Sequence, residues 1–590
     1  MVRGKLVYLI VFLLALTAVL ISIIPDLILL KRTPADTIFP LIHNHPEDYY
    51  YYLSLMRQGY DGHWLLTSYM TPENFSPAFV HTFYALTGHM AKWFNLTIVN
   101  VYFLSRIILG FLLILSSFFL AHKIFGSKKY FIRACIFLLI NNGFWLIGFN
   151  NKQMDFHQYL SFWTRLDPVM RITYIPHHLF STILAVWSVY FLSQALEKKL
   201  LRHCLLAGLL GFFAGFVYFA TMLNLLGGLG MAVLMVSIYK IYLSYDYIKL
   251  KYLSRAGDAK EKKQPRGGML FEHAHGLDPD VTSGEFGRCA KKSYRPQRLR
   301  QDSFYKIMLI AIYVILSGLS LIYLFYLSRT GFPWSGYNQV AEKFTFSFRL
   351  WEYILSLGPF FMLMLFGFKL IVKKLSVLSL MLLGWAIFPI PGIPLFRFFL
   401  PDLGDVYFLE TATYIPIGIL AGFGLMNLEI IFAKRLKIIS ALILIIVVIY
   451  SLIPFYFSIM SQSHQWTTYP YNIYLPREVV EAFKWLDENS PDKSIVLAGG
   501  FLGNVLPAYT HNKVVYGHPA NTYAPAQKME DAYRVFSPQN DTDAPAILKK
   551  YSVSYLFYSR DTDPPRQDLI EKWHLQKVFS SSSTSIYEKN

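Results

Sequence analysis

The chain has 590 residues, of which 54% are hydrophobic and 17% are aromatic, and it carries a formal net charge of +18. Such a composition is too apolar for an ordinary soluble protein. The charge does not indicate nucleic-acid binding, because basic residues cluster in the short connections between apolar segments. The sequence has no Walker loop and no dinucleotide fingerprint, so a nucleotide-driven pump is not indicated.

Apolar runs of about 18 residues or more, each long enough to cross the hydrocarbon core of a bilayer, recur along the chain. The first, Leu6 to Ile24, follows a short basic start and ends in a poor cleavage site, so we expect a retained anchor helix rather than a signal peptide. The pattern predicts about eleven membrane-spanning helices, near residues 6–24, 101–121, 131–148, 172–196, 204–220, 221–243, 307–327, 352–370, 375–391, 413–432 and 438–459.

The distribution of Lys and Arg predicts the orientation of these helices through the positive-inside rule. If the N-terminus lies in the cytoplasm, the first external loop (25–100) and everything after residue 460 lie outside. The basic connections then all fall on the cytoplasmic side, at residues 123–129, 198–202, 246–304, 369–374 and 434–437. The loop at 246–304 is rich in Lys, Arg, Gly and Pro, and we expect it to be mobile, with no activity of its own.

The part after the predicted transmembrane domain (1–460), residues 461–590, is typical of a small folded α/β domain on the outer face. A helix is expected over 476–488, because one face of that stretch is apolar. Short runs rich in β-branched and aromatic residues predict strands at 494–498, 513–516, 553–558 and 584–587, and helices are expected at 523–536 and 544–551.

The acidic pair Glu47-Asp48 directly follows Pro46 in the first external loop. Pro is favourable in the first turn of a helix, so we expect a helix to run from Pro46 toward Gly59. Acidic residues in a first turn are stabilised by the helix dipole without any catalysis. A carboxylate at this membrane surface is also where an enzyme that takes a lipid-linked substrate from the bilayer needs a base. The residues themselves leave both roles open.

Two histidines, His43 and His45, precede the acidic pair. A spacing of two residues in a loop is weak evidence for a metal site, and solvated loop histidines are the simpler interpretation. No metal site is predicted.

The stretch from Glu47 to Gly59, followed by Gly62-His63-Trp64 and Thr71-Pro72-Glu73, resembles the first external loop of the GT-C superfamily. Members of this superfamily are polytopic glycosyltransferases that use polyprenyl-phosphate sugars, and they include relatives of protein O-mannosyltransferase and aminoarabinose transferase. The runs 482–509 and 549–558 are similar to the outer domain of many bacterial members. The resemblance covers nearly the whole chain in architecture, but only the loop motif concerns the chemistry.

The resemblance implies that the acid of this loop is the general base that takes the proton of an acceptor hydroxyl. By position this base is Asp48, with Glu47 as the second candidate. Attack from the face opposite the phosphate would invert the anomeric configuration. Arg or Lys can stabilise the departing phosphate, so no cofactor is required, although a divalent metal remains compatible with this chemistry.

Three arginines near the outer face are candidates for binding substrate. Arg57 lies in the loop that resembles the superfamily. Arg106 lies in the outer half of the second predicted span, where an intramembrane Arg faces protein or ligand, or snorkels to the interface. Arg165 precedes the fourth span, and its alternative role is an ion pair with Asp167 that fixes the loop.

Two histidines and a fourth arginine complete this set of candidates. His177 and His178 follow Pro176 at the outer end of the fourth span, and family members often carry a Pro-His element that resembles this one. Arg397 lies in the last external loop before the tenth span and is the first choice for holding the lipid phosphate. Anchoring at the membrane interface is its alternative role.

Together these features predict a polytopic α-helical, GT-C-like protein of a bacterial or archaeal cytoplasmic membrane, with a small extracytoplasmic α/β domain. It would move a sugar from a polyprenyl-phosphate donor to an acceptor hydroxyl on an unknown glycan, lipid or protein at the outer face. Two alternatives remain. A transporter or flippase for a lipid-linked glycan would show internal pseudo-symmetry, and a non-catalytic envelope scaffold would tolerate loss of Asp48.

Overall fold

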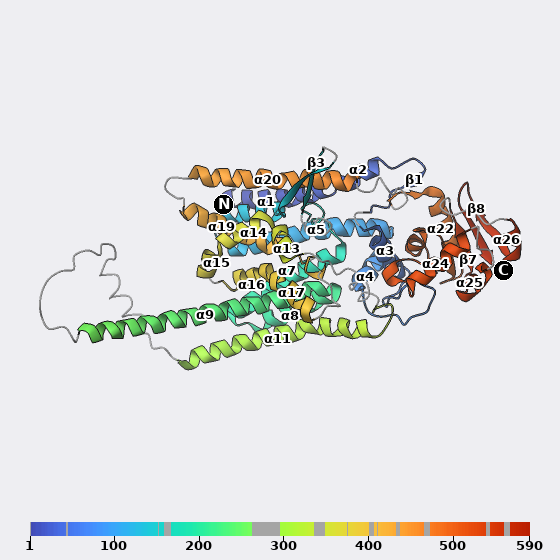
Figure 1. Cartoon of the computed structure of the whole chain (residues 1–590). Helices are drawn as coiled ribbons and strands as arrows, with labels where there is room; N and C mark the ends of the chain where they lie inside the picture. Colours follow the sequence, from blue (N-terminus) through green and yellow to red (C-terminus); the bar gives the residue numbers. More distant parts are fainter. Residues whose placement is uncertain are drawn as a thin grey trace.

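The computed structural model describes residues 2–42, 45–150, 153–158, 167–261, 296–335, 349–374, 376–399, 406–409, 411–431, 437–464, 473–537, 543–559 and 567–589. Long helices run roughly side by side to form a bundle, and a smaller domain with a β-sheet caps one end (Figure 1). The N-terminus lies toward the opposite end, to which α9 (Phe219–Glu261) and α11 (Pro296–Arg329) extend. The orientation of this bundle across a membrane, with the N-terminus in the cytoplasm and the C-terminal domain outside, stays a prediction.

The helices that precede the C-terminal domain differ widely in length. Besides α9 and α11 they are α1 (Val2–Ser22), α2 (Ile24–Lys31), α3 (Pro46–Tyr60), α4 (Thr82–Trp93), α5 (Ile98–Ile124), α6 (Lys128–Ile140), α7 (Pro176–Lys198), α8 (Leu201–Val217), α13 (Leu350–Ser356), α14 (Gly358–Phe366), α15 (Phe368–Lys374), α16 (Val377–Ile387), α17 (Pro389–Phe399), α18 (Val406–Leu409), α19 (Tyr414–Ile431) and α20 (Lys437–His464).

Among the described residues, seven helices are long and apolar enough to cross a membrane, or eight if α16 and α17, bent by 51° against each other, form one span. This number does not confirm the predicted count of about eleven. The predicted division of 204–243 into two helices is confirmed, because α8 ends at Val217 and Tyr218 is extended. The predicted loop at 246–304 is shorter than expected, since α9 continues to Glu261 and α11 begins at Pro296, and its centre lies outside the described residues.

Two of the predicted spans are interrupted. The run 131–148 ends its helix at Ile140, and the chain then enters a hairpin formed by β2 (Trp145–Asn150) and β3 (Gln153–Gln158). The run 352–370 is divided among α13, α14 and α15. The first break lies at Gly358, which has a φ of +73° and would place a Cβ 1.7 Å from the carbonyl oxygen of Asn142. Only glycine permits both this dihedral and this approach.

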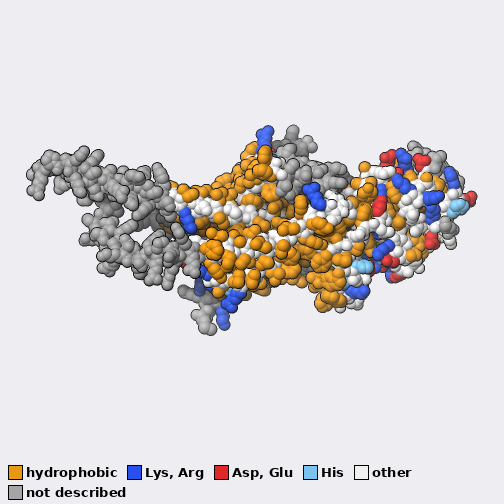
Figure 2. Space-filling view, turned by 90° about the horizontal axis from the view of Figure 1, so that it is seen from below, with side chains coloured by type: hydrophobic (Ala, Val, Ile, Leu, Met, Phe, Trp, Pro, Cys, Tyr) orange, Lys and Arg blue, Asp and Glu red, His pale blue; other side chains and the backbone are white. Residues whose placement is uncertain are grey.

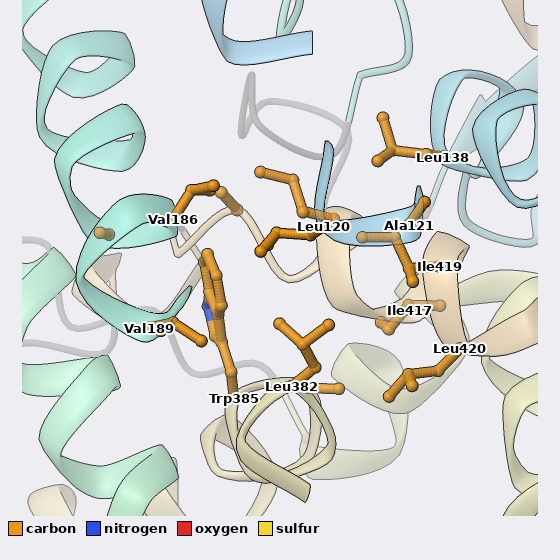
Figure 3. Close-up of a cluster of buried hydrophobic side chains, with 14 of the residues drawn as sticks. Leu120, Ala121, Leu138, Val186, Val189, Leu382, Trp385, Ile417, Ile419 and Leu420 are labelled. Carbon is orange, nitrogen blue, oxygen red and sulfur yellow. The ribbon is translucent and has the colours of Figure 1, made fainter. Parts of the chain in front are cut away.

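The largest hydrophobic core lies inside the bundle, where side chains of α5, α6, α7, α16 and α19 meet (Figure 3). Trp385 of α16 is nearly fully buried near Val186 and Val189 of α7. Its indole N–H donates to the carbonyl oxygen of Thr411 at 3.0 Å, so the polar group of this ring is satisfied. In a bilayer, packing of this kind holds helices together, because lipid tails are as apolar as the core itself.

The C-terminal domain contains a five-stranded mixed sheet in the order β6-β5-β7-β9-β8. β5 pairs in parallel with β6 and β7, whereas β9 pairs antiparallel with β7 and β8. The domain's elements are β4 (Leu475–Pro476), α22 (Arg477–Asn489), β5 (Ile495–Ala498), α23 (Leu502–Tyr509), β6 (Lys513–Val514), η2 (Pro519–Asn521), α24 (Pro525–Phe536), α25 (Ala544–Lys550), β7 (Tyr555–Tyr558), α26 (Gln567–Lys572), β8 (Leu575–Ser580) and β9 (Ser585–Lys589). The predicted α/β fold is confirmed, and β8 is an additional edge strand.

A second hydrophobic core joins the C-terminal domain to the first external loop. Tyr50 and Leu53 of α3 and Tyr84 of α4 belong to it together with Phe483 and Leu506 of the domain, all of them fully buried. β1 (Thr37–Ile38) adds an antiparallel pairing with β4. On the face seen in Figure 2, hydrophobic side chains predominate over the bundle, whereas charged side chains gather on the C-terminal domain. The external loop and the domain therefore form one layer at this end of the bundle.

Candidate active site

α3 places Asp48 at the boundary between the bundle and the C-terminal domain. The helix begins at Pro46, as predicted, and Asp48 lies in its first turn. The side chain of Asp48 is 43% exposed, while the next two residues, Tyr49 and Tyr50, are buried in the shared core. Because the helix is fixed by this core, its one partly exposed acid has a defined position at the surface of the bundle.

The C-terminal domain contributes a hydrogen bond to this acid. Nε2 of His518 lies 3.0 Å from Oδ1 of Asp48, and the His518 side chain is only 10% exposed. Nδ1 of His518 accepts from the backbone N–H of Ala520 at 3.2 Å and from Nδ2 of Asn521 at 3.0 Å. An imidazole nitrogen that accepts carries no proton, so the ring is neutral, its proton is on Nε2, and His518 donates to Asp48.

The surroundings of Asp48 keep its carboxyl group ionised. Burial by itself raises the pKa, but the hydrogen bond from His518, with smaller electrostatic contributions from nearby histidines, outweighs it and holds the pKa of Asp48 below its ordinary value. Asp48 is therefore a carboxylate at neutral pH and can accept a proton in a reaction.

The local geometry also bears on the capping role that the sequence left open. The N-cap residue His45 makes no side-chain capping hydrogen bond, and the carboxylate of Asp48 is directed to His518. Glu47 is exposed, and its contribution to the interface is a backbone one, since its carbonyl oxygen accepts from Nδ2 of Asn504 at 3.0 Å. The two acids thus face different surroundings, and Asp48 is the one held by a side chain.

The predicted pair His177 and His178 lies in the first turn of α7, at the same end of the bundle. Nδ1 of His177 is 2.7 Å from the hydroxyl of Tyr84, whose ring stacks on Tyr52 at 4.6 Å. The ring of His178 stacks on Tyr218 at 3.9 Å. His178 is close enough to Asp48 to influence its ionisation. The structure therefore brings α7 and its buried aromatic neighbours next to the acid, whereas substrate binding by either histidine stays a prediction.

Arg57 lies in the last turn of α3, about 14 Å along the helix axis from Asp48. Its guanidinium binds Asp61 at 3.0 Å and Asp487 of α22 at 3.0 Å, and it donates to the carbonyl oxygen of Tyr509 at 3.3 Å. These contacts favour a role in docking the C-terminal domain. The assignment of Arg57 to substrate stays a prediction that the geometry does not favour.

Arg106 also forms a structural ion pair in this conformation. Its side chain is 1% exposed, its Nη2 lies 3.2 Å from Oδ2 of Asp26, and its Nε donates to the carbonyl oxygen of Thr173 at 2.9 Å. The pair joins α2, α5 and the segment before α7. A guanidinium enclosed in this way does not meet a substrate without rearrangement, so snorkelling to the interface is not observed and substrate binding is not favoured.

Of the remaining two candidate arginines, Arg397 and Arg165, only Arg397 lies within the described residues. Arg397 lies near the end of α17, the second half of the bent pair, with an exposed side chain next to the exposed rings of Phe398 and Phe399. α17 packs mainly on α13, α16 and α18, whereas α3 packs mainly on α4, α5 and α23. Arg165 lies outside the described residues.

The acid predicted to pair with Arg165 has other partners. Oδ1 and Oδ2 of Asp167 accept from Ser458 of α20 at 2.6 Å, and Oδ1 also accepts from the backbone N–H groups of Val169 and Met170 at 2.8 Å. Asp167 thereby fixes the segment before α7 against α20, and its pairing with Arg165 stays a prediction.

Within the described residues, no group of three or more His, Cys, Asp or Glu side chains is arranged to hold a metal ion. His45 is exposed at the start of α3, and His43 lies outside the described part of the chain. Among the described residues, no further side chain joins these two histidines to form a metal site.

The sequence did not single out His518. Its dipeptide His518-Pro519 lies in a loop that shows no periodicity, and its partner Asp48 is 470 residues away. A local signal was present only in the neighbouring Asn521 and Thr522, which are typical of polar turns.

No protein-family model matches this chain, and no curated protein sequence matches it. Solved structures match it over nearly its whole length. They include the Archaeoglobus fulgidus oligosaccharyltransferase tethered with an acceptor peptide, at 15% identity and a TM-score of 0.46, covering 97% of this chain and 74% of that one. They also include ArnT from Cupriavidus metallidurans bound to undecaprenyl phosphate, at 11% identity and a TM-score of 0.46, covering 98% and 97%.

A mycobacterial arabinofuranosyltransferase, AftD, matches at 9% identity and a TM-score of 0.46, with 98% of this chain and 41% of that chain covered. These proteins are GT-C glycosyltransferases, the superfamily whose first external loop the sequence resembles. Identities of 9–15% assign no role to an individual residue. What this chain does is therefore inferred from its own contacts.

Proposed function

We propose that this protein is a GT-C-type membrane glycosyltransferase that moves a sugar from a polyprenyl-phosphate donor to an acceptor hydroxyl outside the cytoplasmic membrane. The observation that carries the proposal is the position of Asp48. It is an ionised, partly exposed carboxylate in the first turn of a fixed helix, at the end of the bundle that carries the C-terminal domain. In the predicted topology, a bilayer-borne donor and an external acceptor can meet at this end.

The reaction requires one base and one stabiliser of negative charge. The acceptor oxygen attacks the anomeric carbon, and its proton passes to Asp48 as the new C–O bond forms. The bond between the anomeric carbon and the phosphate oxygen breaks, and its electron pair leaves with the polyprenyl phosphate. Attack from the side opposite the phosphate inverts the anomeric carbon. Atoms and charge balance without an oxidant, a reductant or a nucleotide.

The leaving phosphate needs a cation. Arg397 has an exposed side chain on an apolar helix, beside the exposed rings of Phe398 and Phe399. An Arg near the end of an apolar helix extends its charged group to the membrane interface, which is the depth of a lipid phosphate. A guanidinium can bind two phosphate oxygens at once, so Arg397 is proposed to hold the donor phosphate.

The test compares Asp48→Asn with Glu47→Gln in the purified full-length protein. Both variants remove one carboxylate from the first turn of α3, and neighbouring helix positions point about 100° apart, so only one can occupy the catalytic position. We expect Asp48→Asn to keep its thermal stability and to lose about 100-fold or more in transfer from a polyprenyl-phosphate sugar, the usual scale of a lost general base. Glu47→Gln should lose less than about 3-fold on the same basis.

Two results would overturn this assignment. Full transfer activity in Asp48→Asn would remove the base and favour the capping role for the pair. A large loss in Glu47→Gln alone would keep the enzyme but move the base by one residue. A modest loss of stability in both variants, with activity retained, is the outcome expected from helix capping alone.

A further inference from the structure

We propose that His518 is a positioning residue for Asp48, and that the C-terminal domain thereby completes the active site. In this role the neutral imidazole holds Oδ1 of Asp48 through its Nε2–H and leaves Oδ2 to take the acceptor proton. The proposal rests on the proposed function, since it presumes that Asp48 is the base. It assigns to the C-terminal domain a part in the chemistry beyond docking on the bundle.

The tautomer of His518 is fixed by the domain itself. Ala520 and Asn521 both donate to Nδ1, so a proton on that nitrogen would lose two hydrogen bonds. The ring lies 5.5 Å from that of Tyr51, which is buried in the same helix as Asp48. His518 is thus held in one orientation with one donor, and that donor is directed at the carboxylate.

The loop that carries His518 is in turn fixed by the first external loop. Ser68 donates to the carbonyl oxygen of Asn521 at 2.6 Å, and Thr522 donates to the carbonyl oxygen of Met70 at 2.8 Å. The residue before His518 is Gly517, where a Cβ would lie 2.6 Å from the sulfur of Met70. The two loops therefore approach closely on both sides of His518, which restricts the distance between His518 and Asp48.

A buried charge pair closes the same interface. Nζ of Lys528 in α24, with a side chain only 2% exposed, lies 2.6 Å from the carboxylate of Glu73 and donates to the hydroxyl of Thr71 at 2.7 Å. A group held in this way keeps its geometry during the reaction, and misplacement of a catalytic group by about 1 Å can cost 10²-fold in rate. The position of Asp48 thus depends on a surface that the C-terminal domain shares with the external loop.

Several titratable groups lie near Asp48. His518 from the C-terminal domain, His45 at the start of α3 and His178 of α7 influence its ionisation. Tyr84 of α4 and Tyr102 of α5 are also within electrostatic range of the Asp48 carboxylate. Burial opposes the charge, and the hydrogen bond from His518 is the largest influence that favours it. Removal of this hydrogen bond should therefore raise the pKa of Asp48, because its burial would then be less compensated.

The experiment measures transfer against pH for full-length wild type, His518→Ala, His518→Gln and His511→Ala in lipid nanodiscs, with a polyprenyl-phosphate sugar as donor. His511→Ala is the matched control, because Nδ1 of His511 also contacts an acid, Asp487, at 3.1 Å in the same domain. That contact lies at the other end of α3, where it does not touch Asp48.

We expect His518→Ala to lower kcat about 10-fold or more and to move the acid limb of the profile to higher pH. His518→Gln keeps an amide donor near the position of Nε2, so it should restore most of the rate and return the limb toward that of the wild type. His511→Ala should change neither the limb nor the rate per folded protein by more than about 2-fold.

The outcomes separate this proposal from the proposed function. If Asp48→Asn is inactive while His518→Ala keeps the wild-type rate and pH profile, the positioning role is overturned and the base remains. If His518→Ala and His518→Gln lose activity equally without a shift of the acid limb, His518 only docks the domain, and the proposal fails in that form. If Asp48→Asn is fully active, both proposals fall together.

Discussion

Both ends of α3 are docked on the C-terminal domain near a contact between an Asp and a His. The two carboxylates differ in the side chain that donates a hydrogen bond to them. At the C-terminal end, Asp487 accepts from Arg57 at 3.0 Å and from the backbone N–H of His511 at 3.2 Å. Its side chain is 25% exposed. At the N-terminal end, Asp48 accepts from the neutral ring of His518 and is 43% exposed.

This difference separates a structural carboxylate from one that is available for chemistry. A guanidinium keeps its charge at every pH at which the protein is folded, so a proton on Asp487 would break an ion pair. A neutral imidazole orients Asp48 without neutralising it, so a proton on Asp48 removes no ion pair between the two side chains. In one helix, the nature of the hydrogen-bond donor therefore distinguishes the docking end from the end that we propose to be reactive.

The largest expected effect comes from a test that replaces two arginines, Arg397 and Arg57, and compares donor kinetics with thermal stability. Arg397→Ala should lower kcat/KM for the donor roughly 30-fold, because a charge-assisted bond to phosphate in a dry site is worth about 2 kcal/mol. Arg397→Lys should restore only part of it, since Lys lacks the planar fork. Arg57→Met should lower the thermal midpoint and leave the donor kcat/KM unchanged. Donor kinetics and thermal unfolding, measured on the same preparations, check both statements.

The opposite pattern would break the comparison. If Arg57→Met loses donor kinetics at unchanged stability, Arg57 binds substrate as the sequence suggested. Wild-type kinetics in Arg397→Ala would require another cation for the phosphate.

A second test uses the acid at the docking end. Asp487→Asn leaves Arg57 with Asp61 but removes one of its two ion pairs and weakens the contact with His511. We expect the protein to lose about 1–3 kcal/mol of stability, the scale of a partly buried charged hydrogen bond. Transfer per folded protein should stay within about 2-fold of the wild type, because Asp487 lies far from the base. A large loss of transfer at unchanged stability would place this end of α3 in the active site as well.

Much of the fold follows from local sequence patterns. Pro46 and the following acids predicted the start of α3 where it is found, and short β-branched runs predicted β5, β6, β7 and β9. Hydropathy did not predict where a long apolar run is divided into separate helices. An average over 352–370 does not respond to a single glycine, yet Gly358 divides that run because its φ is positive and Asn142 approaches its α-carbon.

The candidate site was predictable only in part, for a related reason. A helix start and an acidic pair are local, so Asp48 was found. The partners that assign roles to charged residues are distant in sequence: Asp487 is 430 residues from Arg57, Asp26 is 80 from Arg106 and His518 is 470 from Asp48. No single-sequence pattern contains these pairings, since they depend on how the external loop and the C-terminal domain pack.

The smallest expected effect tests whether neutral donors alone can stabilise a carboxylate in this domain. Glu478 of α22 accepts from the hydroxyls of Ser581, Ser582 and Ser583 and from the backbone N–H of Ser583 at 3.0 Å. Burial raises its pKa, and the hydrogen bonds from the three serines together outweigh burial and lower the pKa to about 2.

A folded-state pKa below the unfolded value gives stability that is present above the unfolded pKa and is lost as the pH falls through the folded one. Wild type should therefore exceed Glu478→Gln in stability by on the order of 1 kcal/mol at pH 6, after solvent screening, and the difference should shrink between about pH 4.5 and 2. Thermal midpoints of both proteins across this range provide the measurement. A difference that stays constant with pH would mean that the shape of the Glu478 side chain, rather than its charge, holds the turn at Ser581–Ser583. Neutral hydroxyl donors would then not suffice to favour an ionised acid. The explanation that the neutral His518 ring favours the ionised form of Asp48 would lose the support of this similar case.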